Sequence, residues 1–190
     1  MKNIYKFGGN TCCFLLAVLM AGCTSSTSYN KAMERNAKKL GDSKRLEDAH
    51  FLVDAASYNI LATKMAEQAI KSGYSASIVS MAKENYEQHV DMGKELKKLA
   101  RKEKIVLPAE MSEVHQTKLA QLASSDRREF DRAYVRILRE ISEEDSRHFA
   151  EMATKGESDD VRAFAARKLD MFKSYETELQ TVDAELLRTY

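Results

Sequence analysis

The sequence predicts an all-α protein, a four-helix bundle in which one long connection joins the second helix to the third. Composition is the first observation behind this: the 190 residues include one proline, seven glycines and no tryptophan, and 31% are charged. Such a composition is typical of a helix-rich single domain and argues against an all-β fold. The second observation is a set of four stretches in which apolar residues recur every three or four positions. A chain near this length buries roughly 70% of its unfolded surface, so its core requires neither a metal nor a disulfide.

Residues 1–22 have the features of a lipoprotein signal peptide. Lys2 and Lys6 precede an apolar run over residues 12–21, and small residues follow before Cys23, which is the layout of a secretory signal. The run LMAGC that ends at Cys23 resembles the bacterial lipobox, whose cysteine is acylated and becomes the first residue of the mature chain. The apolar run is shorter than the ~20 residues that cross a bilayer, so we expect no lasting transmembrane helix.

Cysteine usage favours lipid attachment at Cys23. The other two cysteines, Cys12 and Cys13, lie inside the signal segment, so the mature chain has no pair for a disulfide. Two or three acyl chains would anchor the protein to a bacterial membrane, since each buried CH₂ contributes about 0.8 kcal/mol. A cleaved secretory signal with an incidental cysteine is the alternative. By resemblance to Gram-negative sorting rules, Thr24 implies a periplasm-facing outer-membrane lipoprotein, with an inner-membrane or secreted protein as alternatives.

Residues 23–42 are predicted to form a polar tether, because they contain few large apolar side chains. The helical domain is expected over residues 43–190. Its first two helices are separated at Gly73, a residue type that favours a helix C-terminal cap, so they should form a hairpin. Their inward-facing residues are predicted to be Phe51, Ala55, Tyr58, Ala62, Met65 and Ala69, followed by Ile78, Ala82, Asn85, His89, Met92, Leu96 and Leu99.

A second hairpin is predicted around Gly156. Between the two hairpins, residues 103–125 contain Pro108, which cannot continue a helix, and a short helix is expected over residues 111–123. Two hairpins with one long connection are the arrangement of ferritin-like four-helix bundles. The inward-facing residues of the second hairpin are predicted to be Phe130, Tyr134, Ile137, Ile141, Glu144, His148 and Met152, followed by Val161, Ala165, Lys168, Phe172, Tyr175, Leu179, Val182 and Leu186.

Four segments of the chain resemble, in order, the blocks of a bacterial envelope family classed as a domain of unknown function and numbered four-one-four-two. The segments are LEDAHFLVDAASYNILATKMAEQA, MAKENYEQHVDMGKELKKLARKEKIVLPAE, EFDRAYV and VRAFAARKL. The resemblance extends from about Leu46 to Glu185 and is most specific at residues 130–134 and at Leu107-Pro108. It implies an exported or outer-membrane protein with a ferritin-like bundle.

A ferritin-like bundle in turn implies a dinuclear metal site made of inward-facing carboxylates and histidines. Of the polar core positions that the family resemblance implies, this chain keeps only His89. Ala62 stands in place of a glutamate, Gln88 and Ile141 stand in place of aspartates, and Tyr175 stands in place of a histidine. Most of the carboxylate charge that would hold iron is therefore absent, and we expect no metal and no cofactor beyond the lipid on Cys23.

Asp145 and His148 form the best remaining metal-ligand pair, since an acid and an imidazole three residues apart share one face of a helix. The weak metal candidates are therefore His89, Asp145 and His148. The preferred interpretation is a set of core polar residues, Asn85, His89, Glu144 and Tyr175, that satisfy one another by internal hydrogen bonds.

The residues favour a binding protein over an enzyme. Thirty basic and 29 acidic side chains create no bulk field that would recruit nucleic acid, and no Gly-rich phosphate loop or specific nucleophile–base pair is present. The leading hypothesis is a non-enzymatic, membrane-anchored envelope lipoprotein whose bundle binds another envelope protein or polymer. The alternative is a ferritin-like metal-binding or redox module with a degenerate metal site.

Overall fold

The computed structural model describes residues 27–127 and 129–189, and over these residues the chain forms six helices and no strand. The helices are α1 (Tyr29–Leu40), α2 (Arg45–Ser72), α3 (Ala76–Glu103), α4 (Glu113–Ala123), α5 (Phe130–Lys155) and α6 (Asp159–Thr189). The all-α prediction is confirmed. The predicted signal peptide, residues 1–22, and the predicted lipidation site Cys23 lie outside the described residues. Among the helices that are described, none has the length and apolar character needed to span a bilayer.

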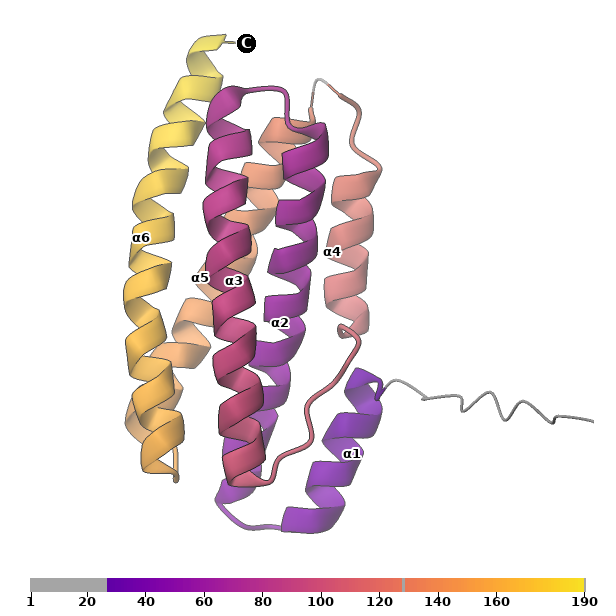
Figure 1. Cartoon of the computed structure of the whole chain (residues 1–190), viewed down its shortest axis with the longest axis vertical. Helices are drawn as coiled ribbons and strands as arrows, with labels where there is room; N and C mark the ends of the chain where they lie inside the picture. The colour runs from indigo at the N-terminus through magenta and orange to yellow at the C-terminus, as the bar shows by residue number, and fades with distance from the viewer. Residues whose placement is uncertain (1–26, 128, 190) are drawn as a thin grey trace, which may run out of the picture.

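Four long helices form the bundle as two hairpins (Figure 1). Helix α2 packs most extensively on α3, and α5 packs most extensively on α6. In Figure 1, α2 runs upward, α3 and α5 run downward, and α6 runs upward again. The long crossover from α3 to α5 climbs the outside of the bundle and contains α4, which confirms the predicted connection and its short helix.

The two hairpin turns have the same construction. Helix α2 ends where the Gly73 N–H donates to the Ala69 carbonyl oxygen at 2.9 Å, and α5 ends where the Gly156 N–H donates to the Met152 carbonyl oxygen at 3.0 Å. A Cβ atom added at Gly73 would lie 2.6 Å from the Ala69 oxygen. Side chains larger than glycine would therefore disturb this turn, and both predicted hairpins are confirmed.

The core is filled by aromatic and aliphatic side chains from all four long helices. Phe51 and Phe149 pack edge to face with ring centroids 4.8 Å apart, and Phe149 packs on Phe172 at 5.1 Å. Each large apolar side chain buried in this way contributes about 1.5–3 kcal/mol to folding. The core therefore depends on packing between the hairpins, which the helices cannot achieve alone.

Helix α1 corrects the predicted tether. The segment was expected to be solvated up to residue 42, yet Ala32 and Asn36 are fully buried. The Asn36 side chain donates to the Val106 carbonyl oxygen at 2.9 Å and accepts from the Val106 N–H at 2.9 Å. A single buried amide thus pairs with a peptide unit of the crossover and makes α1 part of the domain, so the boundary predicted at residue 43 is wrong.

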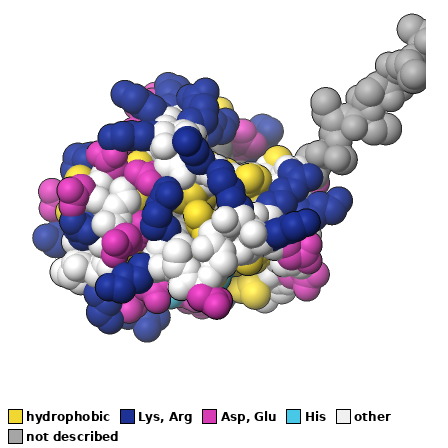
Figure 2. Space-filling view, turned by 90° about the horizontal axis from the view of Figure 1, so that it is seen from below, with side chains coloured by type: hydrophobic (Ala, Val, Ile, Leu, Met, Phe, Trp, Pro, Cys, Tyr) yellow, Lys and Arg dark blue, Asp and Glu magenta, His cyan; other side chains and the backbone are white. Residues whose placement is uncertain are grey.

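The lower end of the bundle carries many basic side chains (Figure 2). Basic residues occupy the last turns of α1 and α3, with Lys38 and Lys39 in the first and Arg101 and Lys102 in the second. Cations at these positions complement the negative ends of the helix dipoles. Several pair with acids, including Arg45 with Glu103 at 3.0 Å, so this surface is partly neutralised.

Candidate functional site

A polar cluster lies at the centre of the bundle, where the family resemblance implies metal ligands. Each long helix contributes to it: Tyr58 from α2, His89 from α3, Tyr134 from α5 and Tyr175 from α6, all at most 1% exposed. The His89 ring lies 5.3 Å from the Tyr58 ring and 5.8 Å from the Tyr175 ring between centroids. The cluster is therefore a set of phenols around one imidazole.

Hydrogen bonds within this cluster are incomplete. His89 Nδ1 lies 3.1 Å from the Asn59 side-chain oxygen, and the Asn85 amide donates to the Tyr134 hydroxyl at 3.3 Å. The polar atoms of the cluster that have no hydrogen-bond partner among the described residues include Asn85 Oδ1, His89 Nε2 and Tyr175 Oη. Each such atom costs about 1–3 kcal/mol when it stays unpaired.

The chemistry of the cluster does not suit a dinuclear metal centre. Burial, followed by the positive charge of Lys168, lowers the pKa of His89 to about 3, so the imidazole is neutral. Burial also raises the pKa of Tyr58 and Tyr175, which keeps both phenols protonated. Phenols, amides and one imidazole provide none of the bridging carboxylates that such a centre uses.

The inward face of α5 corrects the predicted register. Glu144 and His148 were expected to face the core, but both side chains are exposed, whereas Asp145 and Phe149 are buried. After Ile141 the buried positions continue in steps of four rather than in the predicted step of three, so the inward face shifts by one residue. Glu144 therefore does not belong to the core polar set, while Asn85, His89 and Tyr175 lie within the core.

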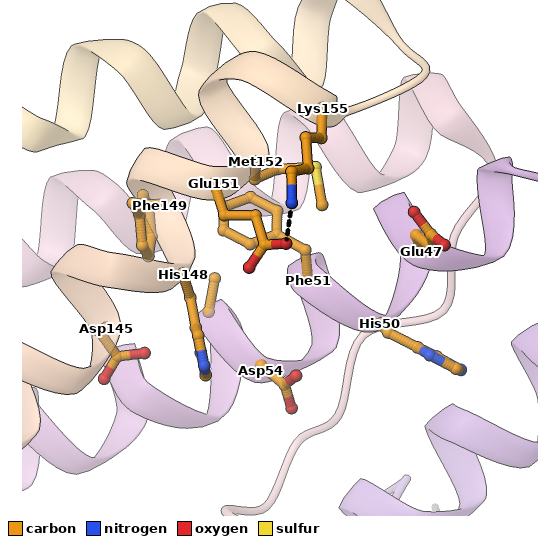
Figure 3. Close-up of a pocket in the computed structure, with 11 residues that line it drawn as sticks. Glu47, His50, Phe51, Asp54, Asp145, His148, Phe149, Glu151, Met152 and Lys155 are labelled. Carbon is orange, nitrogen blue, oxygen red and sulfur yellow. Dashed lines mark hydrogen bonds and ion pairs between the residues drawn. The ribbon is translucent and has the colours of Figure 1, made fainter.

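A groove of about 260 Å³ runs between α2 and α5 in the lower half of the bundle (Figure 3). Apolar side chains line part of its wall, notably Phe51, Phe149 and Met152. The charged and titratable side chains along it are Glu47, His50 and Asp54 from α2, and Asp145, His148, Glu151 and Lys155 from α5. Lys155 pairs with Glu151 at 2.9 Å. The groove therefore carries four carboxylic acids, one of them paired, beside two histidines and one lysine.

Asp145 is the unusual residue of this groove. Its side chain is 6% exposed, and no described residue bonds to its carboxylate. Burial, followed by the negative charges of Glu144 and Asp54, raises the pKa of Asp145 to about 8. A buried acid without a donor or cation is costly in a folded protein, and the shift in the pKa of Asp145 reflects this cost.

The groove extends toward the first turns of α1 and α4. There Asp54 accepts a hydrogen bond from the Tyr29 hydroxyl, and His115 Nδ1 lies 2.7 Å from the Ser57 hydroxyl oxygen. Burial lowers the pKa of His115. Asp54, Asp145 and His148 line both parts, so α1 and α4 complete the walls of one continuous acidic surface.

The three weak metal candidates do not come together. Asp145 and His148 share the groove, but His89 lies in the central cluster and lines neither part of the groove. Across residues 27–127 and 129–189, no group of three or more His, Cys, Asp or Glu side chains is arranged to hold a metal ion. Sequence reasoning missed His50 and Asp54, although their spacing of four places both on one face of α2.

Fold and groove together define a helical-bundle domain with an acidic groove outside its core. The chain belongs to the family described as domain of unknown function (DUF4142), which matches residues 31–182. This match begins inside α1, in agreement with the packing of that helix on the bundle. No curated protein and no solved structure matches the chain.

Proposed function

We propose that the chain is a lipoprotein of the bacterial envelope, anchored through acylated Cys23 at the periplasmic face of the outer membrane. Its domain is a ferritin-like bundle that acts as a binding module for another envelope component and not as an enzyme. The signal-like residues 1–22 and the lipobox resemblance support the anchor. The helix directions, with α2 and α6 opposed to α3 and α5, support the ferritin-like assignment.

The distance between the proposed anchor and the fold supports action close to the membrane. Ser28 caps α1, with its hydroxyl accepting from the Lys31 N–H, and it follows Cys23 by five residues. A fully extended segment of that length reaches at most about 18 Å. Anchoring would hold the groove near the membrane surface and raise its effective concentration toward partners there.

The observation that carries the binding role is the unpaired carboxylate of Asp145 in a groove with an apolar wall. Polar groups that converge in an apolar concave site are typical of ligand sites. A metal-binding or redox module of ferritin-like type would fit the same helix directions. Its carboxylate ligands do not fit, because phenols and amides occupy the centre of the bundle. Binding in the α2–α5 groove is therefore the function that the geometry favours.

The anchor is tested by fractionating cells that express the wild type or Cys23→Ser, together with mass spectrometry of the mature amino terminus. We expect the wild type in membranes with an acylated Cys23, and the variant in the soluble envelope fraction. An unmodified Cys23 thiol, or a variant that stays in the membrane, would contradict the anchor.

The binding role is tested in cells with a photo-cross-linking amino acid at His50, at the groove, or at Thr177, on α6. We expect a discrete adduct from position 50 that is lost in Asp145→Asn, and no such adduct from position 177. Equal adducts from both positions would contradict a role for the groove.

A further inference from the structure

We propose that the α2–α5 groove binds a linear alkylammonium compound, with the Asp145 carboxylate as the contact for an ammonium group. The inference deepens the proposed function, on which its biological setting rests, by naming the ligand class for the same groove. It follows from the charge, the shape and the lining of the groove.

The charge of the groove selects a cation. Glu47, Asp54 and Asp145 face it together with Glu151, while its one lysine, Lys155, is already bound to Glu151. His50 and His148 are the other basic side chains of its lining. Asp145 is 6% exposed, and burial and neighbouring negative charges, with no hydrogen bond from a described residue, account for the environment of its carboxylate. An ammonium group supplies three donors and one positive charge, so it would satisfy this carboxylate and offset the repulsion from Asp54.

The distribution of these acids selects an elongated cation over a metal ion. The described His, Asp and Glu side chains do not converge on one point that could hold an ion. Instead, Asp145 and Glu47 lie toward opposite ends of the labelled set in Figure 3, with Asp54 between them. A linear diamine places one ammonium group at each end of an alkyl chain and therefore matches this arrangement.

The lining of the groove suits an alkyl chain. Phe51, Phe149, Met152 and Ala55 form its apolar part, and the two phenylalanine rings are fixed edge to face at 4.8 Å. Aromatic rings attract ammonium groups, and methionine adapts to flexible aliphatic guests. The volume of about 260 Å³ is slightly below the usual range for drug-sized ligands, so it favours a small amine or a single lysine side chain.

The direct test is calorimetric titration of the acylated protein, purified in neutral detergent, with 1,5-diaminopentane at pH 7.5. The comparison compounds are 1,5-pentanediol, which has the same chain without charge, and chloride salts of Mn²⁺ and Zn²⁺. A capped lysine amide distinguishes a protein side chain from a free amine as the natural source. We expect saturable binding of the diamine, of the capped lysine, or of both, and none of the diol.

Substitutions of the groove acids test which of them contacts the ammonium group. Asp145→Asn should weaken diamine binding by about tenfold or more, since it removes a charge-assisted hydrogen bond, and Glu47→Gln should weaken it by about threefold, as a more exposed charge contact. The control Asp170→Asn alters an exposed acid on α6 and should leave the affinity unchanged.

Three results would overturn the inference: no saturable amine binding, equal binding of the diol, or metal binding that Asp145→Asn abolishes while amine binding is absent. Failure here is separable from failure of the proposed function, because cross-linking at position 50 would still report a partner of different chemistry.

Discussion

Asp48 and Asp131 hold equivalent places in the two hairpins, and each carboxylate binds the turn of the other hairpin. Asp131 accepts from the N–H groups of Tyr74 and Ser75 at 2.9 and 2.8 Å. Asp48 accepts from the N–H groups of Glu157 and Ser158 at 2.9 and 2.8 Å. Both acids are 1% exposed. Two reciprocal clamps, one at each end of the bundle, therefore fix the hairpins against each other.

The clamps reveal an internal repeat. Gly73 follows Asp48 by 25 residues, and Gly156 follows Asp131 by the same interval. Ser75 precedes α3, and Ser158 precedes α6 in the same way. Each serine hydroxyl accepts a hydrogen bond from the backbone N–H of the residue three positions later. The bundle is thus built from two similar helical hairpins related by an approximate twofold arrangement.

Removing one clamp should destabilise the whole domain. Asp131→Ala leaves two partly buried N–H groups without a charged acceptor, so we expect the free energy of unfolding to fall by about 2–3 kcal/mol. Urea denaturation measures it, with the exposed acid Asp170→Ala as the matched control. Asp48→Ala should cost a similar amount, and the two losses should add because the sites are far apart. A loss below about 0.5 kcal/mol for either variant would mean that the clamps are not structural.

Neutralising Asp145 should stabilise the protein. The pKa of Asp145 rises from an ordinary 3.8 to about 8 in the folded state, so between these values the folded state binds more protons than the unfolded state. The contribution of Asp145 to the free energy of unfolding is therefore fully present below about pH 4 and declines as the pH rises toward 8. Asp145→Asn should raise the free energy of unfolding at pH 7.5 by about 1–3 kcal/mol, with little change at pH 4.

Thermal or urea unfolding of wild type and Asp145→Asn across pH 4–8 measures this difference. Glu144→Gln, which removes an adjacent but exposed acid, is the control and should have a smaller effect. A variant that is less stable than the wild type at pH 7.5 would show that the Asp145 carboxylate has an internal partner.

The contribution of His89 to stability should depend on pH in the opposite direction. Its pKa falls from 6.5 to about 3 in the folded state, so the unfolded state binds more protons between these values. Stability from the neutral imidazole is present above pH 6.5 and is lost as the pH falls toward 3. In His89→Gln, this acid-dependent loss should disappear, a change of up to about 1.4 kcal/mol per pH unit.

The measurement for His89 is the slope of stability against pH between 6.5 and 4, compared with His148→Gln at the exposed rim of the groove. Nitrogen NMR of the His89 ring at pH 5 gives an independent readout, for which we expect a neutral imidazole. A protonated ring at that pH would contradict the buried cluster as described.

Helix α1 should detach when its one buried amide is removed. Asn36→Ala leaves the Val106 N–H and carbonyl groups without their partners, and we expect a loss of about 2–3 kcal/mol in the local stability of α1. Amide hydrogen exchange should then quicken throughout α1 while α3 and α6 keep their protection. Asn30→Ala, on the exposed side of the same helix, is the control; equal exchange in both variants would argue against the contact.

The four long helices and the crossover were predictable from local signals in the sequence. Gly73, Pro108 and Gly156 interrupt helices for steric reasons that operate within a few residues. Helix α1 was not predictable in this way, because Asn36 finds its partner 70 positions along the chain at Val106. A polar segment becomes a packed helix only when a distant peptide unit satisfies its buried amide.

The candidate site was predictable only in part. The pair Asp145 and His148 was visible from spacing, but the change of register on α5 that buries Asp145 and exposes Glu144 depends on packing against α2. His50 and Asp54 become relevant only once α2 and α5 lie side by side. The sequence also does not separate the tyrosines of the centre from the carboxylates of the groove, because both sets lie on the same helices. Only the packing of the helices assigns them to different places.

The most direct test of the account is carbon NMR titration of the Asp145 side-chain carboxyl in the full acylated protein, alone and with saturating 1,5-diaminopentane. We predict a pKa of about 8 for the free protein and a markedly lower pKa with the diamine bound, because an ammonium group favours the ionised carboxylate. A carboxyl that already titrates near 4 in the free protein, or a pKa that the diamine leaves unchanged, would contradict the claim that Asp145 awaits a cationic partner.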